Sequence, residues 1–153
     1  MNVVAFNGSP RRDENTSLLL KVVAEELAKE GIETEQIDIA AARPHGCIAC
    51  RQCSENRNER CAIQDDPVNE WIQRIKQADG VIFASPTYFA NVTAEMKALI
   101  DRAGMVARAN GGLFRRKVAA AVIAVRRGGA VPAFDAINHM FQINQMIVVG
   151  SSY

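Results

Sequence analysis

The stretch VVAFNGSP, residues 3–10, decides the fold, because it joins an apolar run to a turn near the start of the chain. The run has the length and composition of a buried strand, and Asn-Gly followed by Ser-Pro ends it. Apolar residues then recur at helical spacing and predict the buried face of a helix: Leu19, Val22, Val23 and Leu27. The chain therefore begins as strand, loop and helix.

Helices and strands alternate through the rest of the chain. The first helix has N-cap chemistry in Asn15, Thr16 and Ser17, and Gly31 stands at its expected C-cap. Four more strands are predicted at Glu33–Ile39, Gly80–Ser85, Val118–Val125 and Met146–Val149. Three more helices are predicted: one opened by Asp65-Asp66-Pro67 that buries Trp71, Ile72 and Ile75, one over Thr93–Ala103 that buries Met96, Leu99 and Ile100, and one over Pro132–Asn144 that buries Phe134, Ile137 and Phe141.

This alternation predicts an α/β fold with a doubly wound, five-stranded parallel sheet between layers of helices. The segment Val118–Val125 is nearly all apolar, which is typical of a central strand buried on both faces. Ligands of such sheets bind beyond the carboxyl ends of the strands, where the strand order reverses. The loops that follow strands are therefore the candidate site.

Composition indicates one ordinary domain over residues 1–153, with 48% hydrophobic and 23% charged residues. A net charge of +1 gives no field for holding nucleic acid or an anionic membrane. No apolar stretch approaches the roughly 20 residues that span a bilayer, and no signal peptide is visible. We therefore expect a cytoplasmic protein without a nucleic-acid or membrane partner.

Three loops after predicted strands carry candidate binding residues. The first, residues 8–17, combines hydroxyls, an amide, an arginine and helix-start N–H groups, which suits a single phosphate. The second, residues 85–91, sets two aromatic side chains beside backbone amides, which suits a flat heterocycle. The third, residues 126–129, pairs two arginines with two glycines and can place positive charge near a reduced ring. Taken singly, each loop also fits a plain turn.

Sets of acid, base and nucleophile are missing from the sequence. The two histidines, His45 and His139, give no Ser-His-Asp or Cys-His spacing. We interpret His139 as structural and keep His45 as an alternative metal ligand. A flavin fits such a sequence, because it carries its own electron chemistry and needs mainly binding and electrostatics from the protein.

The four cysteines lie together, at Cys47, Cys50, Cys53 and Cys61, in a long loop over residues 44–66. A C-x2-C-x2-C-x7-C cluster in a cytosolic chain indicates a metal or redox centre rather than disulfide staples. The spacing lets four thiolates meet on one [4Fe-4S] cluster, the interpretation we favour. Structural zinc and free or disulfide-linked thiols are the alternatives.

The three loops together resemble those of the NADPH-dependent FMN reductase family in the flavodoxin-like superfamily, and the cysteine motif resembles that of its iron–sulfur flavoprotein branch. The resemblance implies strand order 2-1-3-4-5 and phosphate contacts from Ser9, Arg11, Asn15, Thr16 and Ser17. It implies flavin-ring contacts from Pro86, Thr87, Tyr88, Phe89, Asn91, Gly128 and Gly129. Arg126 or Arg127 would favour the reduced, anionic ring.

The function we expect is an FMN-dependent oxidoreductase that exchanges electrons between FMN and a [4Fe-4S] cluster. An NAD(P)H-dependent FMN or quinone reductase without a cluster is the alternative, and a zinc-stapled binding module is the second. Redox partners would be ferredoxin, a quinone or an oxygen species. The topology predicts the cysteine loop on the flavin side of the sheet. No helix follows the fifth predicted strand, so we also expect a truncated chain or a homodimer or homotetramer.

Overall fold

The computed structural model describes residues 1–150 and contains one parallel sheet of five strands in the order β2-β1-β3-β4-β5. The strands are β1 (Asn2–Asn7), β2 (Glu33–Asp38), β3 (Gly80–Pro86), β4 (Val118–Ala124) and β5 (Ile147–Val148). The helices are α1 (Asn15–Lys29), α2 (Gln52–Asn56), α3 (Val68–Gln77), α4 (Ala94–Ala109) and α5 (Ala130–Ile143), with a 3-10 turn at Ala40–Ala42. The predicted fold and strand order are confirmed.

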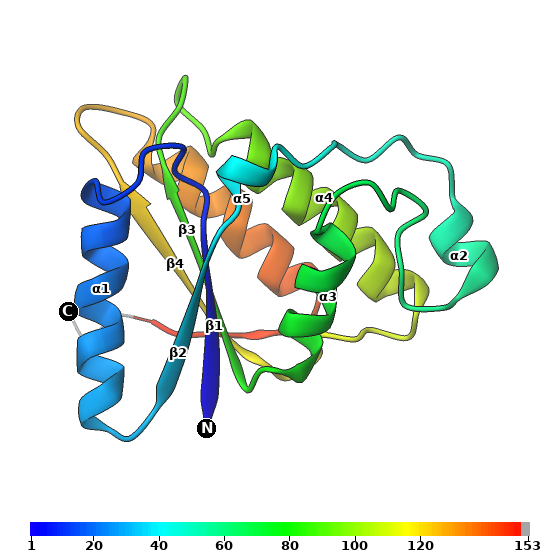
Figure 1. Ribbon diagram of the computed structural model, residues 1–153, viewed down its shortest axis with the longest axis horizontal. Coiled ribbons are helices and arrows are strands. Elements are labelled where there is room, and N and C mark those ends of the chain that lie inside the picture. Colours follow the sequence, from blue (N-terminus) through cyan, green and yellow to red (C-terminus); the bar gives the residue numbers. More distant parts are fainter. Residues whose placement is uncertain (151–153) are drawn as a thin grey trace.

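Helices cover the two faces of the sheet unequally (Figure 1). One face carries α3, α4 and α5 and holds the larger core, in which Phe83 packs against Phe6 and Phe141 with ring centroids 5.5 and 5.3 Å apart. The other face carries α1, whose Leu20 packs with Ala5 and Ile82. Alternate residues of β1 and β3 point to opposite faces, so both strands are buried on both sides.

Strand β4 lies between β3 and β5 as predicted, but the expectation that it is buried on both faces is wrong. Only Ala119 is fully buried, and Val118 is 44% exposed. Two features explain the difference. Its outer neighbour β5 pairs with it at two positions, Val118 and Ala119, and α1 is the single helix among the described residues on that face.

Several predicted buried faces are corrected by the structure. Leu19 and Val22 of α1 are exposed, and Leu20 is the buried leucine of that helix. Phe134 is 44% exposed, although Ala133 before it and Ile137 and Phe141 after it in α5 are fully buried. The inward residues predicted for α3 and α4 are all buried.

Helix ends differ from the sequence prediction at the start of α1. The N-cap is Glu14, which makes no side-chain cap, and the predicted caps Asn15, Thr16 and Ser17 lie inside the helix. At the other end, Gly31 follows the C-cap Glu30 with a φ of +71°. In α3 the N-cap is Pro67, and the Asp66 carboxylate accepts a hydrogen bond from the Val68 N–H at 3.2 Å.

Within residues 1–150, no helix combines the length and the apolar character that a membrane crossing requires. The expectation that no helix follows the fifth strand concerns residues 151–153, which lie outside the described part of the chain.

Candidate functional site

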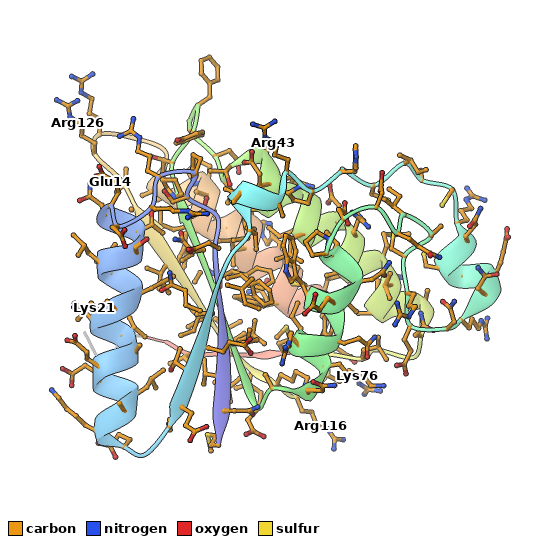
Figure 2. The ribbon with its side chains drawn as sticks, in the orientation of Figure 1. Glu14, Lys21, Arg43, Lys76, Arg116 and Arg126 are labelled. Atoms are coloured by element: carbon orange, nitrogen blue, oxygen red, sulfur yellow. The ribbon has the colours of Figure 1, made fainter. Side chains whose placement is uncertain are left out.

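A cleft of about 810 Å³ opens at the carboxyl edge of the sheet, between the start of α1 and the ends of β3 and β4. Figure 2 shows Glu14, at the start of α1, and Arg126, in the loop after β4, on the same side of the molecule. The walls of the cleft are lined by residues of α1, of the ends of β3 and β4 and of the loops beside them: Ser9, Arg11, Glu14, Asn15, Thr16, Leu18, Leu19, Val22, Pro86, Thr87, Tyr88, Ile123, Ala124, Val125 and Arg126. The cleft therefore joins all three loops that the sequence singles out.

Asn7, at the end of β1, holds the first loop in place. Its amide donates to the Ser17 hydroxyl at 3.0 Å and to the Asp38 carboxylate at 2.9 Å, and its carbonyl oxygen accepts from the Ser9 N–H at 3.0 Å. The side chain is buried and each of its polar groups has a partner, so it fixes the loop without competing for a ligand.

A second set of buried contacts ties the first loop to the second. The Gly8 N–H donates to the Ala84 carbonyl at 2.8 Å, and the Thr93 hydroxyl donates to the Gly8 carbonyl at 2.9 Å. The Thr93 N–H in turn donates to the Ser85 hydroxyl at 3.1 Å. A Cβ at Gly8 would lie 3.1 Å from the Thr93 hydroxyl and 3.2 Å from the Ala84 carbonyl, so glycine permits this close approach.

The start of α1 presents an anion-binding geometry to the cleft. Glu14 supplies no side-chain cap, so the first-turn N–H groups lack the partner that Thr93 gives to α4. The Ser9 hydroxyl closes a turn with the backbone of Arg11, at 3.2 Å from both its N–H and its carbonyl. Uncapped helix N–H groups beside a guanidinium suit a phosphate.

The second and third loops form the opposite rim. Tyr88 and Asn91 exchange backbone hydrogen bonds of 2.8 and 3.1 Å across a turn in which Phe89 and Ala90 have φ of +48° and +64°. Gly129, with φ of +92°, fits against this turn, where a Cβ would lie 2.5 Å from the Ala90 Cα. The Thr87 N–H donates to the Ala124 carbonyl at 3.0 Å. Backbone contacts thus fix the relative position of the two loops.

The cysteines line a separate cavity of about 110 Å³ beside α4. All four thiols contribute to it: Cys47 and Cys50 are exposed, Cys53 and Cys61 are half-buried, and none forms a disulfide. Its other walls are Ile48, Ala49, Arg51, Ala62, Ile63, Arg102, Met105 and Val106. The structure thus brings the four predicted ligands together around one space.

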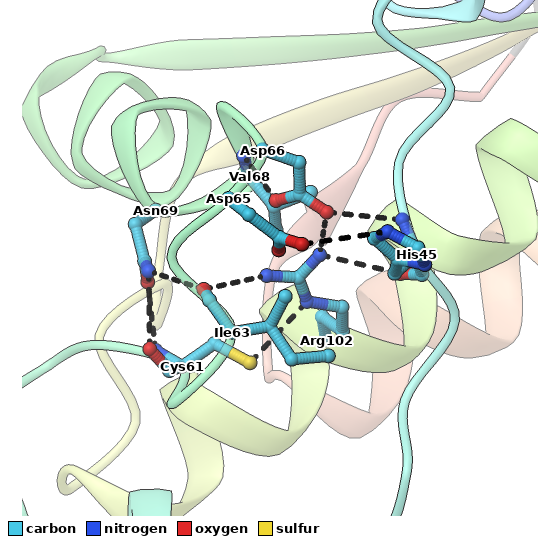
Figure 3. Close-up of polar contacts among 8 residues, drawn as sticks. All are labelled: His45, Cys61, Ile63, Asp65, Asp66, Val68, Asn69 and Arg102. Carbon is cyan, nitrogen blue, oxygen red and sulfur yellow. Dashed lines mark hydrogen bonds and ion pairs between the residues drawn. The ribbon is translucent and has the colours of Figure 1, made fainter.

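Arg102 of α4 fastens the cysteine segment to the core (Figure 3). Its guanidinium is fully buried and donates from Nη1 to the His45 carbonyl at 3.2 Å, from Nη2 to the Ile63 carbonyl at 3.1 Å and from Nε to the Cys61 Sγ at 3.3 Å. Nη1 also forms an ion pair with Asp66, whose side chain is equally hidden from water. Every partner of this guanidinium belongs to residues 45–66.

The charges of this pair are mutually stabilised. Burial by itself raises the pKa of Asp66, but hydrogen bonds from Arg102 and from the His45 and Val68 N–H groups outweigh it and leave that pKa below its ordinary value. Burial lowers the pKa of Arg102, while the contacts with Asp66 and Cys61 more than offset it, so that this pKa lies above its ordinary value. Both groups are therefore charged at neutral pH.

Asn69 of α3 clamps the other end of the cysteine segment. Its carbonyl oxygen accepts from the Cys61 N–H at 2.7 Å, and its amide donates to the carbonyls of Cys61 and Ile63 at 3.0 and 2.9 Å (Figure 3). Cys61 is thereby held through both its backbone and its sulfur.

A model of the NADPH-dependent FMN reductase family matches residues 1–153. The chain belongs to this family. It is accordingly a flavin-dependent oxidoreductase that uses FMN. Its three loops and its cleft lie where the doubly wound fold places ligands.

Individual relatives refine this assignment. The chain is 42% identical to an iron-sulfur flavoprotein of Methanocaldococcus jannaschii, over 99% of this chain and 77% of that protein. Its fold is similar to that of the flavoenzyme NAD(P)H:(acceptor) oxidoreductase of Paracoccus denitrificans, with a TM-score of 0.70 and 22% identity over 99% and 76% of the two chains. An archaeal flavodoxin gives a TM-score of 0.64 at 12% identity, over 99% and 80% of the two chains. The chain is thus a member of the iron–sulfur flavoprotein branch with a flavodoxin-like fold.

Of the flavin-site residues predicted for this family member, the cleft brings together Ser9, Arg11, Asn15, Thr16, Pro86, Thr87, Tyr88 and Arg126. The others lie outside its lining: Ser17, Phe89, Asn91, Arg127, Gly128 and Gly129. Ser17 is engaged by Asn7, and the Phe89 side chain is fully exposed at the turn. Asn91 and Gly129 shape that turn through their backbones.

The two histidines lie away from both cavities. His45 contributes its carbonyl to Arg102, while its exposed ring lies 3.7 Å from the Asp65 carboxylate and lines no part of the cysteine cavity. His139 is exposed on α5, so it is not a core residue.

The supporting residues were missed by the sequence reasoning. Asn7, Thr93 and Asp66 bond to backbone or to other side chains, and such partners follow from the fold rather than from any motif. The burial of Arg102 could have been inferred from the sequence, because Arg102 follows Leu99 by three residues and precedes Val106 by four. A charged residue on the apolar face of a helix indicates a buried counter-charge.

Proposed function

We propose that the chain binds FMN in the 810 Å³ cleft and a [4Fe-4S] cluster at Cys47, Cys50, Cys53 and Cys61, and that it exchanges electrons between the two groups. FMN supplies two-electron and one-electron chemistry when bound, and an iron–sulfur cluster supplies one-electron chemistry. The protein itself contributes binding, charge and shielding from water.

The observation that carries the FMN half is the uncapped start of α1, which lines the same cleft as Arg11. In the proposal, N–H groups of the first turn, together with Ser9, Arg11, Asn15 and Thr16, bind the phosphate, and Ser17 supports them through Asn7. Pro86, Thr87 and Tyr88 contact the flavin ring. The aromatic ring of Tyr88 suits contact with such a flat heterocycle. Arg126 supplies positive charge beside it.

Five predicted residues that do not line the cleft have a supporting role in the proposal: Phe89, Asn91, Arg127, Gly128 and Gly129. The turn at Phe89 and Ala90 and Gly129, which packs against it, set the height of the rim, whereas Gly128 makes no close contact there. Arg127 adds positive charge in the same loop. Phe89, fully exposed at the turn, is available to a redox partner or a second subunit, in keeping with the homodimer or homotetramer we expect.

The observation that carries the cluster half is the gathering of four free thiols around one cavity. Within residues 1–150, no three Cys, His, Asp or Glu side chains stand close enough to hold a single metal ion. A zinc ion needs each thiolate at about 2.3 Å from one centre. A [4Fe-4S] cluster binds each thiolate through a different iron, so it accepts more widely spaced ligands. The similarity of the chain to iron-sulfur flavoproteins favours the cluster over zinc.

NAD(P)H is the electron donor in this proposal, and ferredoxin, a quinone or an oxygen species is the acceptor. An FMN or quinone reductase without a cluster remains the competing function, since it would use the same cleft. The two differ only in the role of the cysteines.

Anaerobic purification followed by a visible spectrum and by iron and acid-labile sulfide assays tests the proposal. We expect bound FMN, broad brown absorbance bleached by dithionite, and about four irons and four sulfides per chain. Cys47→Ser should lose the iron and slow electron delivery to one-electron acceptors. Full FMN with neither iron nor sulfide would favour the cluster-free reductase, and one zinc per chain would favour the binding module.

A further inference from the structure

Arg102 stands out as a charged side chain that the proposed function does not by itself require. It projects from the apolar face of α4, its side chain has no exposure to water, and it lines the same cavity as the four cysteines. A buried guanidinium is costly unless every donor finds a partner. Its partners therefore show what it is for.

Three of those partners are oxygens and one is sulfur. The oxygens belong to His45, Ile63 and Asp66, and they are enough to fix the segment mechanically. The remaining donor, Nε, points at the Cys61 Sγ at 3.3 Å. A neutral thiol is a weak acceptor, whereas a metal-bound thiolate is a good one. The orientation of Nε therefore suits a Cys61 that carries negative charge.

Asp66 balances this arrangement without touching the sulfur. Its Oδ2 pairs with Nη1 of Arg102 and accepts the His45 N–H at 3.0 Å, and its Oδ1 accepts the Val68 N–H. The ion pair is thus neutral overall but oriented, with the cation facing Cys61 and the anion behind it. Removal of the cation and removal of the anion should therefore change the electrostatic potential at Cys61 in opposite directions.

We propose that Arg102 is a positioning residue that holds Cys61 as a cluster ligand and raises the reduction potential of the cluster, with Asp66 as the counter-ion that limits this rise. The inference rests on the cluster of the proposed function. Hydrogen bonds to ligand sulfur stabilise the more negative, reduced state and so raise the potential.

Anaerobic redox titration of the full chain, with the cluster followed by its visible absorbance and electron paramagnetic resonance, tests the inference. Arg102→Gln should lower the cluster potential by about 59 mV, a tenfold change in the one-electron equilibrium. Asp66→Asn should raise it. Arg108→Gln, at an exposed position of the same helix, and Asp65→Asn, at the exposed neighbour of Asp66, should leave it unchanged.

Shifts of the cluster potential in opposite directions in Arg102→Gln and Asp66→Asn distinguish the proposal from a purely structural role. In a purely structural role, both variants would lose the cluster, and the potential of the remaining cluster would not shift in opposite directions. If Arg102→Gln fails to fold, the double variant Arg102→Gln, Asp66→Asn removes both charges and should still lower the potential, because the N–H to sulfur bond is gone. Equal potentials in wild type and folded variants overturn this inference alone. A wild type without iron and sulfide overturns the proposed cluster, and the inference with it.

Discussion

Asp66 makes the stability of the chain depend on pH. Its folded-state pKa is depressed, so the stability that it contributes is present above its unfolded pKa, about 3.9, and is lost as the pH falls through the lower folded value. We expect Asp66→Ala to lower the free energy of unfolding by about 3–5 kcal/mol at pH 7, because the Arg102 charge is left buried and unpaired. Equilibrium urea unfolding from pH 7 to pH 3 measures both effects.

The difference between wild type and Asp66→Ala should shrink as the pH falls below about 4, since wild type then loses the carboxylate as well. Asp65→Ala is the matched control, because the neighbouring carboxylate is exposed and should change stability by no more than about 0.5 kcal/mol. A difference that stays constant down to pH 3 would contradict the assignment of the charge to Asp66.

At this scale the sequence indicates the candidate binding residues more clearly than the residues that support them. The four cysteines are recognisable because their spacing is itself the signal, and the structure gathers them around one cavity. Arg102 and Asn7 act through carbonyls and side chains that are distant in sequence, such as Ile63 and Asp38. Those pairings come into existence only when α4 lies against the cysteine segment and β1 lies beside β2.

The loop after β4 depends on one glycine. Gly129→Ala should disturb the rim of the cleft, because a Cβ would lie 2.5 Å from the Ala90 Cα and the φ of +92° disfavours any side chain. We expect a loss of about 1–3 kcal/mol in stability and weaker FMN binding. Thermal unfolding with and without FMN, together with titration of flavin fluorescence, measures the two effects.

Gly128→Ala is the matched control, since nothing lies within 4 Å of its Cβ position and its φ is not in the left-handed region. The neighbouring substitution should leave FMN affinity nearly unchanged. Equal effects of the two alanines would show that the close approach to Ala90 does not shape the cleft.

At the scale of elements, the alternation of strands and helices was readable because apolar spacing reflects burial directly. The prediction was wrong where burial depends on a neighbour that the sequence does not reveal. Strand β4 is apolar enough for a strand covered on both faces, yet within residues 1–150 β5 pairs with it at two positions. Leu19 and Val22 of α1 are apolar because they line the cleft and not because they belong to the core. Apolar periodicity cannot distinguish these two environments.

The whole molecule keeps its two cavities apart. The cleft lies between α1 and the ends of β3 and β4, and the cysteine cavity lies against α4, with no lining residue in common. The cysteine segment does leave the carboxyl edge of the sheet after β2, but it then runs along α4, and α2 lies far from α1 (Figure 1). The prediction that placed it on the flavin side therefore holds only for its beginning.

Separate cavities should be separable by mutation. We expect Arg11→Ala to weaken FMN binding about tenfold, the loss of one charge-assisted hydrogen bond, while the iron content stays the same. The adjacent Arg12→Ala is the control, since Arg12 is exposed and lines neither cavity. Cys47→Ser should do the reverse, losing iron while FMN affinity stays within twofold of wild type. Calorimetric FMN titration and iron analysis on the same anaerobic samples measure both; loss of FMN affinity in Cys47→Ser would mean that the two cavities are coupled.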